Sequence, residues 1–177
     1  MKITISTPLT DSIISDLHAG DEVLINGIIY TGRDAAHKRL NALINNNEKL
    51  PVELTNQIIY YTGPTPPQAG KVIGSAGPTT SSRMDRYTPG LISASGLRGI
   101  IGKGNRSKEV IDSFVKHHCV YFAAIGGAGA LLSKCITASE IVCYEDLGAE
   151  AIYKLSVCNF PAIVAIDCNG NNLYARK

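Results

Sequence analysis

The chain has 177 residues, enough for one compact domain that buries roughly two-thirds of the surface exposed by its unfolded form. With 45% hydrophobic residues, 18% charged residues and a formal charge of +2, its composition is globular and gives no indication of a nucleic-acid or membrane surface. No apolar run approaches the ~18 residues of a membrane span and no signal peptide is evident, so we expect a cytoplasmic protein and a single domain over residues 1–177.

Short runs rich in Ile, Val and Tyr predict the strands. In chain order they cover residues 3–6, 22–32, 57–63, 70–77, 99–104, 119–125, 140–146 and 162–167. Apolar residues at helical spacing predict helices from Asp34 to about Asn45 and from Ser107 to His117, and further helices are expected after Pro78 and Gly126. The Pro-rich residues 62–70 predict a rigid surface loop. Strands that alternate with a few helices indicate a mixed α/β fold.

The cysteines do not form a recognisable framework. The chain has five of them, an odd number, and no C-x-x-C pair; they are Cys119, Cys135, Cys143, Cys158 and Cys168. This pattern argues against disulfides, a zinc site or a self-contained iron–sulfur site. We expect buried, reduced thiols that behave as small hydrophobic residues. The alternative is a single thiol close to a functional site, for which Cys119 is the first candidate.

The first polar cluster occupies residues 30–40. A strand ends at Gly32, and Arg33 and Asp34 open the helix that follows, with Asp34 as the expected N-cap. The free N–H groups of a helix N-terminus attract anions, and an arginine there can clamp a carboxylate with two hydrogen bonds. The alternative is a capped surface helix with solvated basic side chains. We expect His37 and Lys38 either on the exposed side of the helix or behind the residues that would contact a ligand.

The second cluster, residues 76–85, has four consecutive hydroxyl side chains before Arg83. Pro78 suits a helix entry, and if the helix starts at Thr79, then Thr79 and Arg83 face the same side. A threonine hydroxyl is far too weak an acid to act as a base unless cations and oriented donors lie nearby. The alternative is a hydroxyl-rich helix cap with Arg83 on the surface.

The third cluster, residues 99–105, places Lys103 between two glycines at the end of a buried strand. Glycine allows close approach to a ligand and lysine supplies a point charge, although a tight turn with a solvated lysine has the same pattern. The sequence does not match a phosphate-binding loop. Arg33, Arg83 and Lys103 would then all lie at strand ends, where open α/β sheets bind ligands. A dicarboxylate would suit them. No metal-ligand set or carboxylate dyad accompanies them, so the residues alone indicate an anion-binding domain with an incomplete active site.

Five longer strings span most of residues 20–132: TGRDAAHKRL, IIYYTGPTP, GPTTSSRMDRYTP, IGKGNRS and YFAAIGGAGALL. In this order they resemble the class I, iron–sulfur fumarases, and the related L-tartrate dehydratase β subunit has the same layout. The intact GRDAAHKR and GPTTSSRMD strings are more similar to fumarase. The resemblance implies the swivelling β/β/α domain of the fumarase β subunit or C-terminal domain. It also implies a hydro-lyase that interconverts fumarate and (S)-malate.

The resemblance further implies that the chain is inactive without a partner. In this family a separate α subunit or N-terminal domain binds a [4Fe-4S] cluster through three cysteines, and the unique iron coordinates the substrate. The cluster is therefore expected on the partner, with no metal on this chain, in a hetero-oligomer for which α2β2 is one arrangement. The alternatives are the β subunit of L-tartrate dehydratase and a non-catalytic anion-binding module.

Carried over motif by motif, the resemblance gives each residue a role. It implies that Arg33 binds a substrate carboxylate and that Thr79 is the base that removes the C3 proton of malate. Arg83 and Lys103 would hold carboxylate and stabilise the negative charge that develops when this weakly acidic proton is removed. Thr80 is kept as the second candidate for the base and as a substrate-binding residue.

Overall fold

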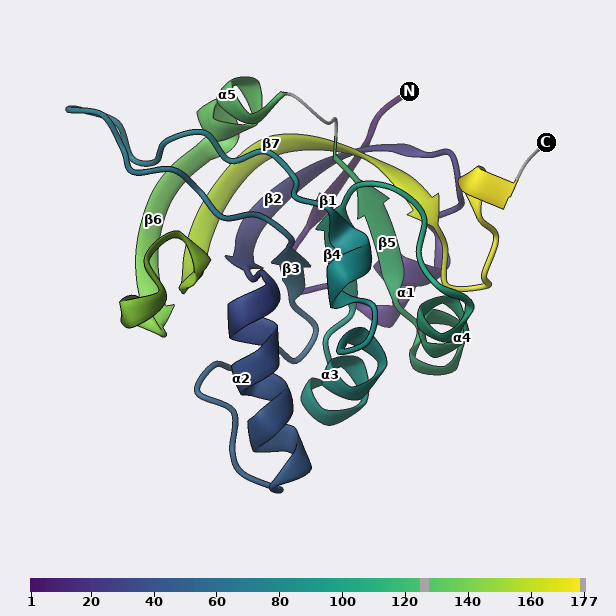
Figure 1. The fold of residues 1–177 in the computed structure, drawn as a ribbon. Helices are drawn as coiled ribbons and strands as arrows, with labels where there is room; N and C mark the ends of the chain where they lie inside the picture. The colour runs from purple at the N-terminus through teal and green to yellow at the C-terminus, as the bar shows by residue number, and fades with distance from the viewer. Residues whose placement is uncertain (125–127, 176–177) are drawn as a thin grey trace.

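The structure is a computed structural model that describes residues 1–124 and 128–175. Within these residues, a seven-stranded mixed sheet forms the centre of the fold (Figure 1). Its spatial order is β1 (Ile3–Ser6), β2 (Glu22–Thr31), β3 (Ile58–Tyr60), β4 (Gly99–Gly102), β5 (Val120–Ala123), β7 (Ile152–Ile166) and β6 (Ile136–Cys143). Neighbours from β1 to β5 are parallel, whereas β7 runs antiparallel to each strand that it pairs with.

Strand β7 closes part of the sheet into a ring. It has 15 residues and pairs with β6, β5 and β2, and its Ile163 is opposite both Glu22 of β2 and Ala123 of β5. The register between β2 and β7 shifts between Ile25 and Gly27. Gly27 has φ of +102°, and a Cβ there would lie 2.6 Å from Thr7 Oγ1, so both conformation and space favour glycine.

Alternating side chains build one core on each face of the sheet. Tyr60, Ile101 and Phe122 point into the ring, together with Ile25 and Phe160. Their chain neighbours point to the other face, which the helices cover; these neighbours are Ile59, Tyr61, Ile100 and Tyr121. This period of two accounts for the continuous apolar runs of the parallel strands, because such strands are buried on both faces.

Three helices cover the outer face of the sheet, and two shorter ones lie elsewhere (Figure 1). The α-helices of the described residues are α1 (Asp11–Ser15), α2 (Asp34–Asn45), α3 (Thr88–Ser95), α4 (Lys108–His117) and α5 (Gly129–Leu132). The 3-10 segments are η1 (Ser81–Met84), η2 (Ser133–Cys135), η3 (Glu145–Glu150) and η4 (Leu173–Ala175). Leu40 of α2, Leu91 of α3 and Phe114 of α4 are buried against the sheet. None of the described helices is long and apolar enough to cross a membrane.

The mixed α/β class and the helices at 34–45 and 107–117 are confirmed, with Ser107 as the N-cap of α4. The strand expected at 70–77 is wrong. The chain between β3 and η1 instead extends away from the body of the domain and returns without regular secondary structure (Figure 1). Its two arms are joined by isolated backbone hydrogen bonds, such as the one from Gly74 N to Thr65 O at 3.1 Å. The strand expected at 162–167 is only the end of β7, and β6 begins four residues before its expected start, at Ile136.

Two further helices begin later than the sequence predicted. After Pro78 the chain first forms η1, so the first α-helix there is α3. Gly126 lies outside the described residues, and α5 begins at Gly129.

Candidate functional site

The carboxyl ends of β2, β3 and β4 meet at one edge of the sheet. Thr31 of β2 is opposite Tyr60 of β3, and Tyr60 is opposite Ile101 of β4. Because these strands are parallel, the segments that follow them leave from the same edge. Arg33 follows β2 and Lys103 follows β4, so the fold brings both cations to this edge.

Arg33 occupies the N-cap position of α2, and Asp34 is the first helical residue. The expected N-cap at Asp34 is therefore wrong by one position. The Arg33 side chain makes no capping hydrogen bond, and Ala35 N in the first turn donates instead to Glu150 Oε1 at 3.4 Å. The Arg33 side chain lies against the turn after β3, where a Cβ on Gly63 would be 2.9 Å from Arg33 Cδ. Its guanidinium is 3.8 Å from the Asp34 carboxylate and 3.9 Å from that of Glu150. Arg33 Nε is buried without a hydrogen-bond partner among the described residues.

His37 is buried directly behind Arg33, and Lys38 is exposed, so the two residues occupy the two kinds of position expected for them. His37 Nδ1 is 2.8 Å from the backbone carbonyl oxygen of Arg33. A carbonyl only accepts, so Nδ1 carries the proton and Nε2 is an unprotonated, buried atom. Burial lowers the pKa of His37 to about 4, against the opposing effect of the hydrogen bond to Arg33. The imidazole is therefore neutral near pH 7.

The hydroxyl-rich segment lies across the ends of β3 and β4. Thr79 N donates to Tyr61 O at 2.8 Å, and Thr80 forms an isolated parallel bridge with Lys103. Thr79 thus has strand-like pairing, and the helix expected to start there begins instead at Ser81 as η1. The helical-face argument for Thr79 and Arg83 is wrong for the same reason, because Thr79 precedes η1 and Arg83 lies within it.

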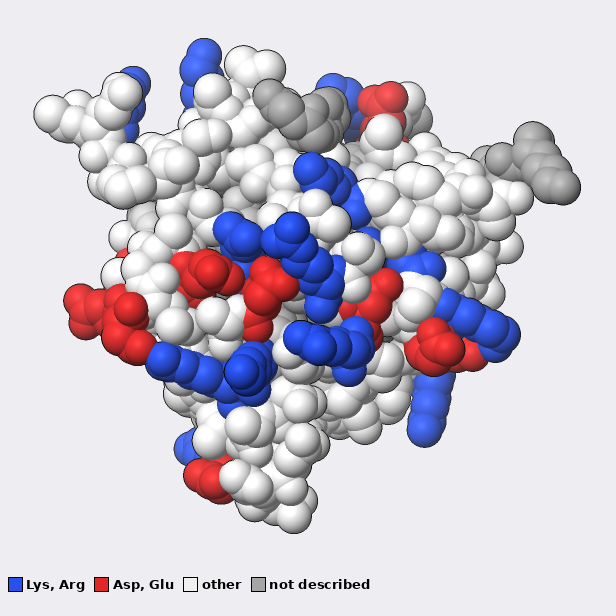
Figure 2. Space-filling view, in the orientation of Figure 1, with Lys and Arg blue, Asp and Glu red and all other residues white. Residues whose placement is uncertain are grey.

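The predicted site side chains at this edge are largely unengaged. Thr79 is half-buried, and Thr80, Arg83 and Lys103 are exposed. In the described ranges, none of these four side chains has a hydrogen-bond or ion-pair partner. Figure 2 shows Lys and Arg gathered across the middle of this face, with Asp and Glu among them. Cations with free donors at a sheet edge are suited to bind a small anion.

A buried ion pair supports the edge and was not found from the sequence. Arg106 is only 2% exposed in its side chain, and its Nη1 lies 2.6 Å from Asp85 Oδ1. The other Asp85 oxygen accepts from Ser107 N at 3.0 Å, and Arg106 Nη2 donates to Lys103 O at 3.4 Å. Burial raises the pKa of Asp85, while the adjacent Arg106 opposes that rise. The pair joins the end of η1 to the segment that carries Lys103.

The cysteine singled out from the sequence lies away from this edge. Cys119 precedes β5 at its amino end and is buried, and burial raises its pKa to about 12. The alternative that Cys119 approaches the site is therefore wrong. Burial of all five thiols is also wrong, because Cys158 is exposed. Among the residues that the structure describes, no three His, Cys, Asp or Glu side chains gather into a group that could hold a metal ion.

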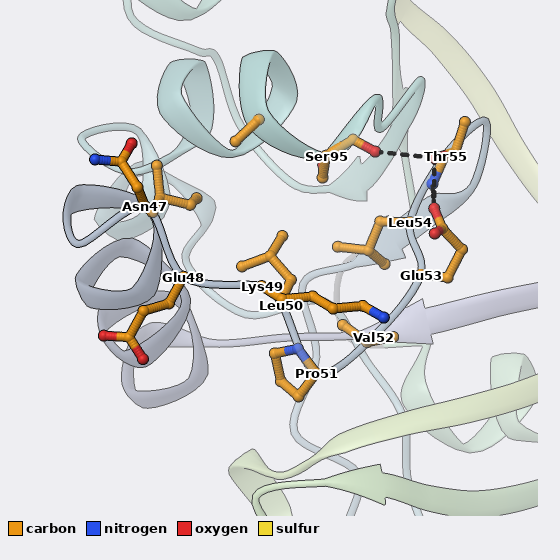
Figure 3. A pocket seen from close by; sticks show the side chains of 12 residues that line it. Asn47, Glu48, Lys49, Leu50, Pro51, Val52, Glu53, Leu54, Thr55 and Ser95 are labelled. Atoms are coloured by element: carbon orange, nitrogen blue, oxygen red, sulfur yellow. Dashed lines mark hydrogen bonds between the residues drawn. The ribbon is translucent and has the colours of Figure 1, made fainter.

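A separate hollow lies at the other end of the sheet. It has a volume of about 680 Å³ and lies between the end of α2, the loop leading to β3 and Ser95 of α3 (Figure 3). The Thr55 hydroxyl contacts Ser95 O at 3.3 Å and the Glu53 carboxylate. Because this hollow borders the amino end of β3, it is separate from the edge that carries Arg33 and Lys103.

The family described as Fumarase C-terminus matches residues 1–177 of the chain. The chain belongs to this family. It is 38% identical over 177 residues to "Fumarate hydratase class I, anaerobic" of Escherichia coli (strain K12), a match that covers 98% of this chain and 32% of that protein. It is 38% identical over 165 residues to "Fumarate hydratase 2" of Leishmania major, which covers 92% of this chain and 29% of that protein. The resemblance seen in the sequence is confirmed.

A third relative has a different length. "Putative L(+)-tartrate dehydratase subunit beta" of Methanocaldococcus jannaschii is 40% identical over 171 residues, which is 94% of this chain and 88% of that protein. The chain therefore spans about a third of the fumarate hydratases that it matches, but most of this β subunit.

Proposed function

We propose that the chain is the β-type half of a hydro-lyase that interconverts fumarate and (S)-malate, folded as a single swivelling β/β/α domain over residues 1–177. The supporting observation is the edge at which β2, β3 and β4 end. Arg33, the Thr79–Thr80 segment and Lys103 all lie there, and the side-chain donors of Arg83 and Lys103 have no partner in the described part of the chain. The named relatives support the same reaction class.

Each residue has a role that its position permits. Arg33, at the N-cap of α2, binds one carboxylate of the substrate with the positive end of the helix behind it. The hydroxyl of Thr79 takes the C3 proton of malate. Arg83 and Lys103 hold the second carboxylate and stabilise the charge that builds on it as this proton leaves. A small dicarboxylate needs cations on both ends, and this edge supplies them.

The proposal places the [4Fe-4S] cluster on a partner α subunit, in a hetero-oligomer. The described residues do not fit a cluster, since no three of their Cys, His, Asp or Glu side chains gather. The tartrate dehydratase relative carries the word beta in its name and has nearly the length of this chain, which supports a separate second subunit. We therefore assign to this chain only carboxylate binding, charge stabilisation and proton removal.

The test is to mix the purified chain with a reconstituted cluster-bearing α subunit under anaerobic conditions. Fumarate hydration is expected only in the mixture. The Thr79→Ala variant should lower turnover by on the order of 100-fold or more, as loss of a positioned catalytic group does. Ser82→Ala is the matched control, because Ser82 is exposed in the same segment and has no assigned role.

Two outcomes would contradict the proposal. Hydration by the isolated chain would refute the division between subunits. Full activity of Thr79→Ala together with loss of activity in Thr80→Ala would move the base by one residue.

A second candidate, an L-tartrate dehydratase β subunit, is favoured by the match to a β subunit over 88% of its length. Both substrates are hydroxy-dicarboxylates, so the same cations would bind either. The assembled complex decides between them: faster turnover of tartrate than of malate would replace the first candidate by the second.

A further inference from the structure

We propose that Ser81 is a positioning residue that holds Thr79 in place relative to Lys103. The inference rests on the proposed function, because it explains how the proposed base and a proposed cation keep a fixed separation. Ser81 begins η1, and its side chain is buried with 1% exposure. Because the residue is buried, its hydroxyl would act through the backbone of its neighbours.

The Ser81 hydroxyl links the two segments directly. Its Oγ donates to the backbone carbonyl of Thr79 at 3.1 Å and accepts from the backbone N–H of Lys103 at 2.9 Å. A hydroxyl can make both bonds at once, since it has one donor and two acceptor lone pairs. The link lies beside the isolated bridge between Thr80 and Lys103, which it reinforces.

The strand end is shaped around this oxygen. A Cβ on Gly102 would lie 2.3 Å from Ser81 Oγ and 3.0 Å from the Tyr121 hydroxyl, so any larger residue would push the oxygen away. Gly102 does not have a positive φ, and the reason for glycine here is therefore space. The Tyr121 hydroxyl in turn donates to Gly104 O at 3.0 Å, which fixes the turn on the far side of Lys103.

The neighbouring hydroxyls lack this arrangement. Thr80 and Ser82 are exposed and Thr79 is half-buried, and none of the three has a side-chain hydrogen bond in the described chain. Of the four consecutive hydroxyls in residues 79–82, Ser81 alone is both buried and bonded to the two segments. Its role is thus structural for the site, whereas Thr79 has a free hydroxyl for chemistry.

Removal of the Ser81 hydroxyl would break both hydrogen bonds, the one to Thr79 O and the one from Lys103 N, and allow Thr79 and Lys103 to move relative to each other. A displacement of about 1 Å can cost on the order of 100-fold in rate when a proton must be transferred over a short distance. We therefore expect Ser81→Ala to lower kcat by roughly 10- to 100-fold.

The test uses the assembled complex and (S)-malate deuterated at C3. In Ser81→Ala, proton removal should become more rate-limiting, so the isotope effect on kcat should rise above that of the wild type, while the subunits still assemble. The matched control is Ser82→Ala, which should keep the wild-type kcat and isotope effect. Gly102→Ala, which displaces the oxygen without deleting it, should reproduce the behaviour of Ser81→Ala.

The outcomes separate three cases. If Ser81 served folding alone, its variant would show less active enzyme but unchanged KM and isotope effect, and the inference would be refuted. Wild-type kinetics in Ser81→Ala would refute it as well. If the wild-type complex had no hydro-lyase activity, the proposed function itself would fail, whatever the behaviour of Ser81→Ala. Full activity of Thr79→Ala would remove the proposed base and with it the role of Ser81 in positioning Thr79.

Discussion

The buried pair of Arg106 and Asp85 offers a quantitative test of how the candidate site is supported. Arg106→Met keeps most of the side-chain volume and removes the charge. The Asp85 carboxylate then loses its ion pair and keeps the hydrogen bond from Ser107 N. Lys103 O loses its bond from Arg106 at the same time. A carboxylate left buried without its partner is strongly destabilising.

The cost can be estimated from the environment of the pair. Removing one partner of a buried ion pair typically costs about 3–5 kcal/mol. Because the Asp85 side chain is 16% exposed and keeps one backbone donor, we expect the lower end, about 3 kcal/mol. For a chain of this length that corresponds to a fall in Tm of roughly 6–12 °C. Arg106 also lowers the pKa of Asp85, so its loss should raise that pKa further.

Urea unfolding of the wild type, Arg106→Met, Asp85→Asn and the double variant measures the pair as a thermodynamic cycle. The double variant should lose clearly less stability than the two single variants added together, because it leaves no buried unpaired charge. Additive costs, or an unchanged midpoint for Arg106→Met, would show that the pair does not stabilise this edge. The reasoning about the support of Lys103 would then be wrong.

Two further predictions concern pH and packing. His37 has a folded-state pKa of about 4 against 6.5 for the free side chain. The free energy of unfolding should therefore fall as the pH drops from 6.5 toward 4, by about 3 kcal/mol at most. Urea midpoints between pH 7 and 4.5 should show this fall, and His37→Gln should flatten it; equal slopes would contradict the assignment. Phe114→Ala removes a fully buried ring and should cost about 3–5 kcal/mol, whereas Val115→Ala, on an exposed neighbour, should stay within about 0.5 kcal/mol in the same assay; similar costs would place the core wrongly.

Local patterns predicted the parts of the fold that depend on local physics. The apolar stripe from Asp34 to Asn45 and the Ser107 cap specify helices that the structure has at those positions. Short β-branched runs identified β2 and β4, and the polar residues after them indicated the edge where Arg33 and Lys103 lie. These signals work because parallel strands end together at one edge.

Other features depend on partners distant in the sequence. β7 is more than twice as long as the apolar run that predicted it, because its first half is stabilised by pairing with β2 and β6. His37 and Arg106 carry polar side chains that are usually exposed, and only the packing of Tyr61 or Asp85 against them shows that they are buried. Residues 70–77 have strand-like composition but no neighbouring strand to pair with in the described sheet. A single sequence contains no direct record of such contacts.

The closure of the ring by β7 has a consequence for folding. The strand pairs with β2, about 130 residues earlier in the chain, so the contact that joins the two sides of the sheet is among the most distant in sequence. Contacts between residues so far apart in the sequence form only at the cost of a large loss of chain entropy, and they slow folding. During synthesis, β2 to β5 emerge first and their apolar inner faces stay open to water until the last strand arrives. This interval is when the nascent chain is most prone to aggregate or to require a chaperone.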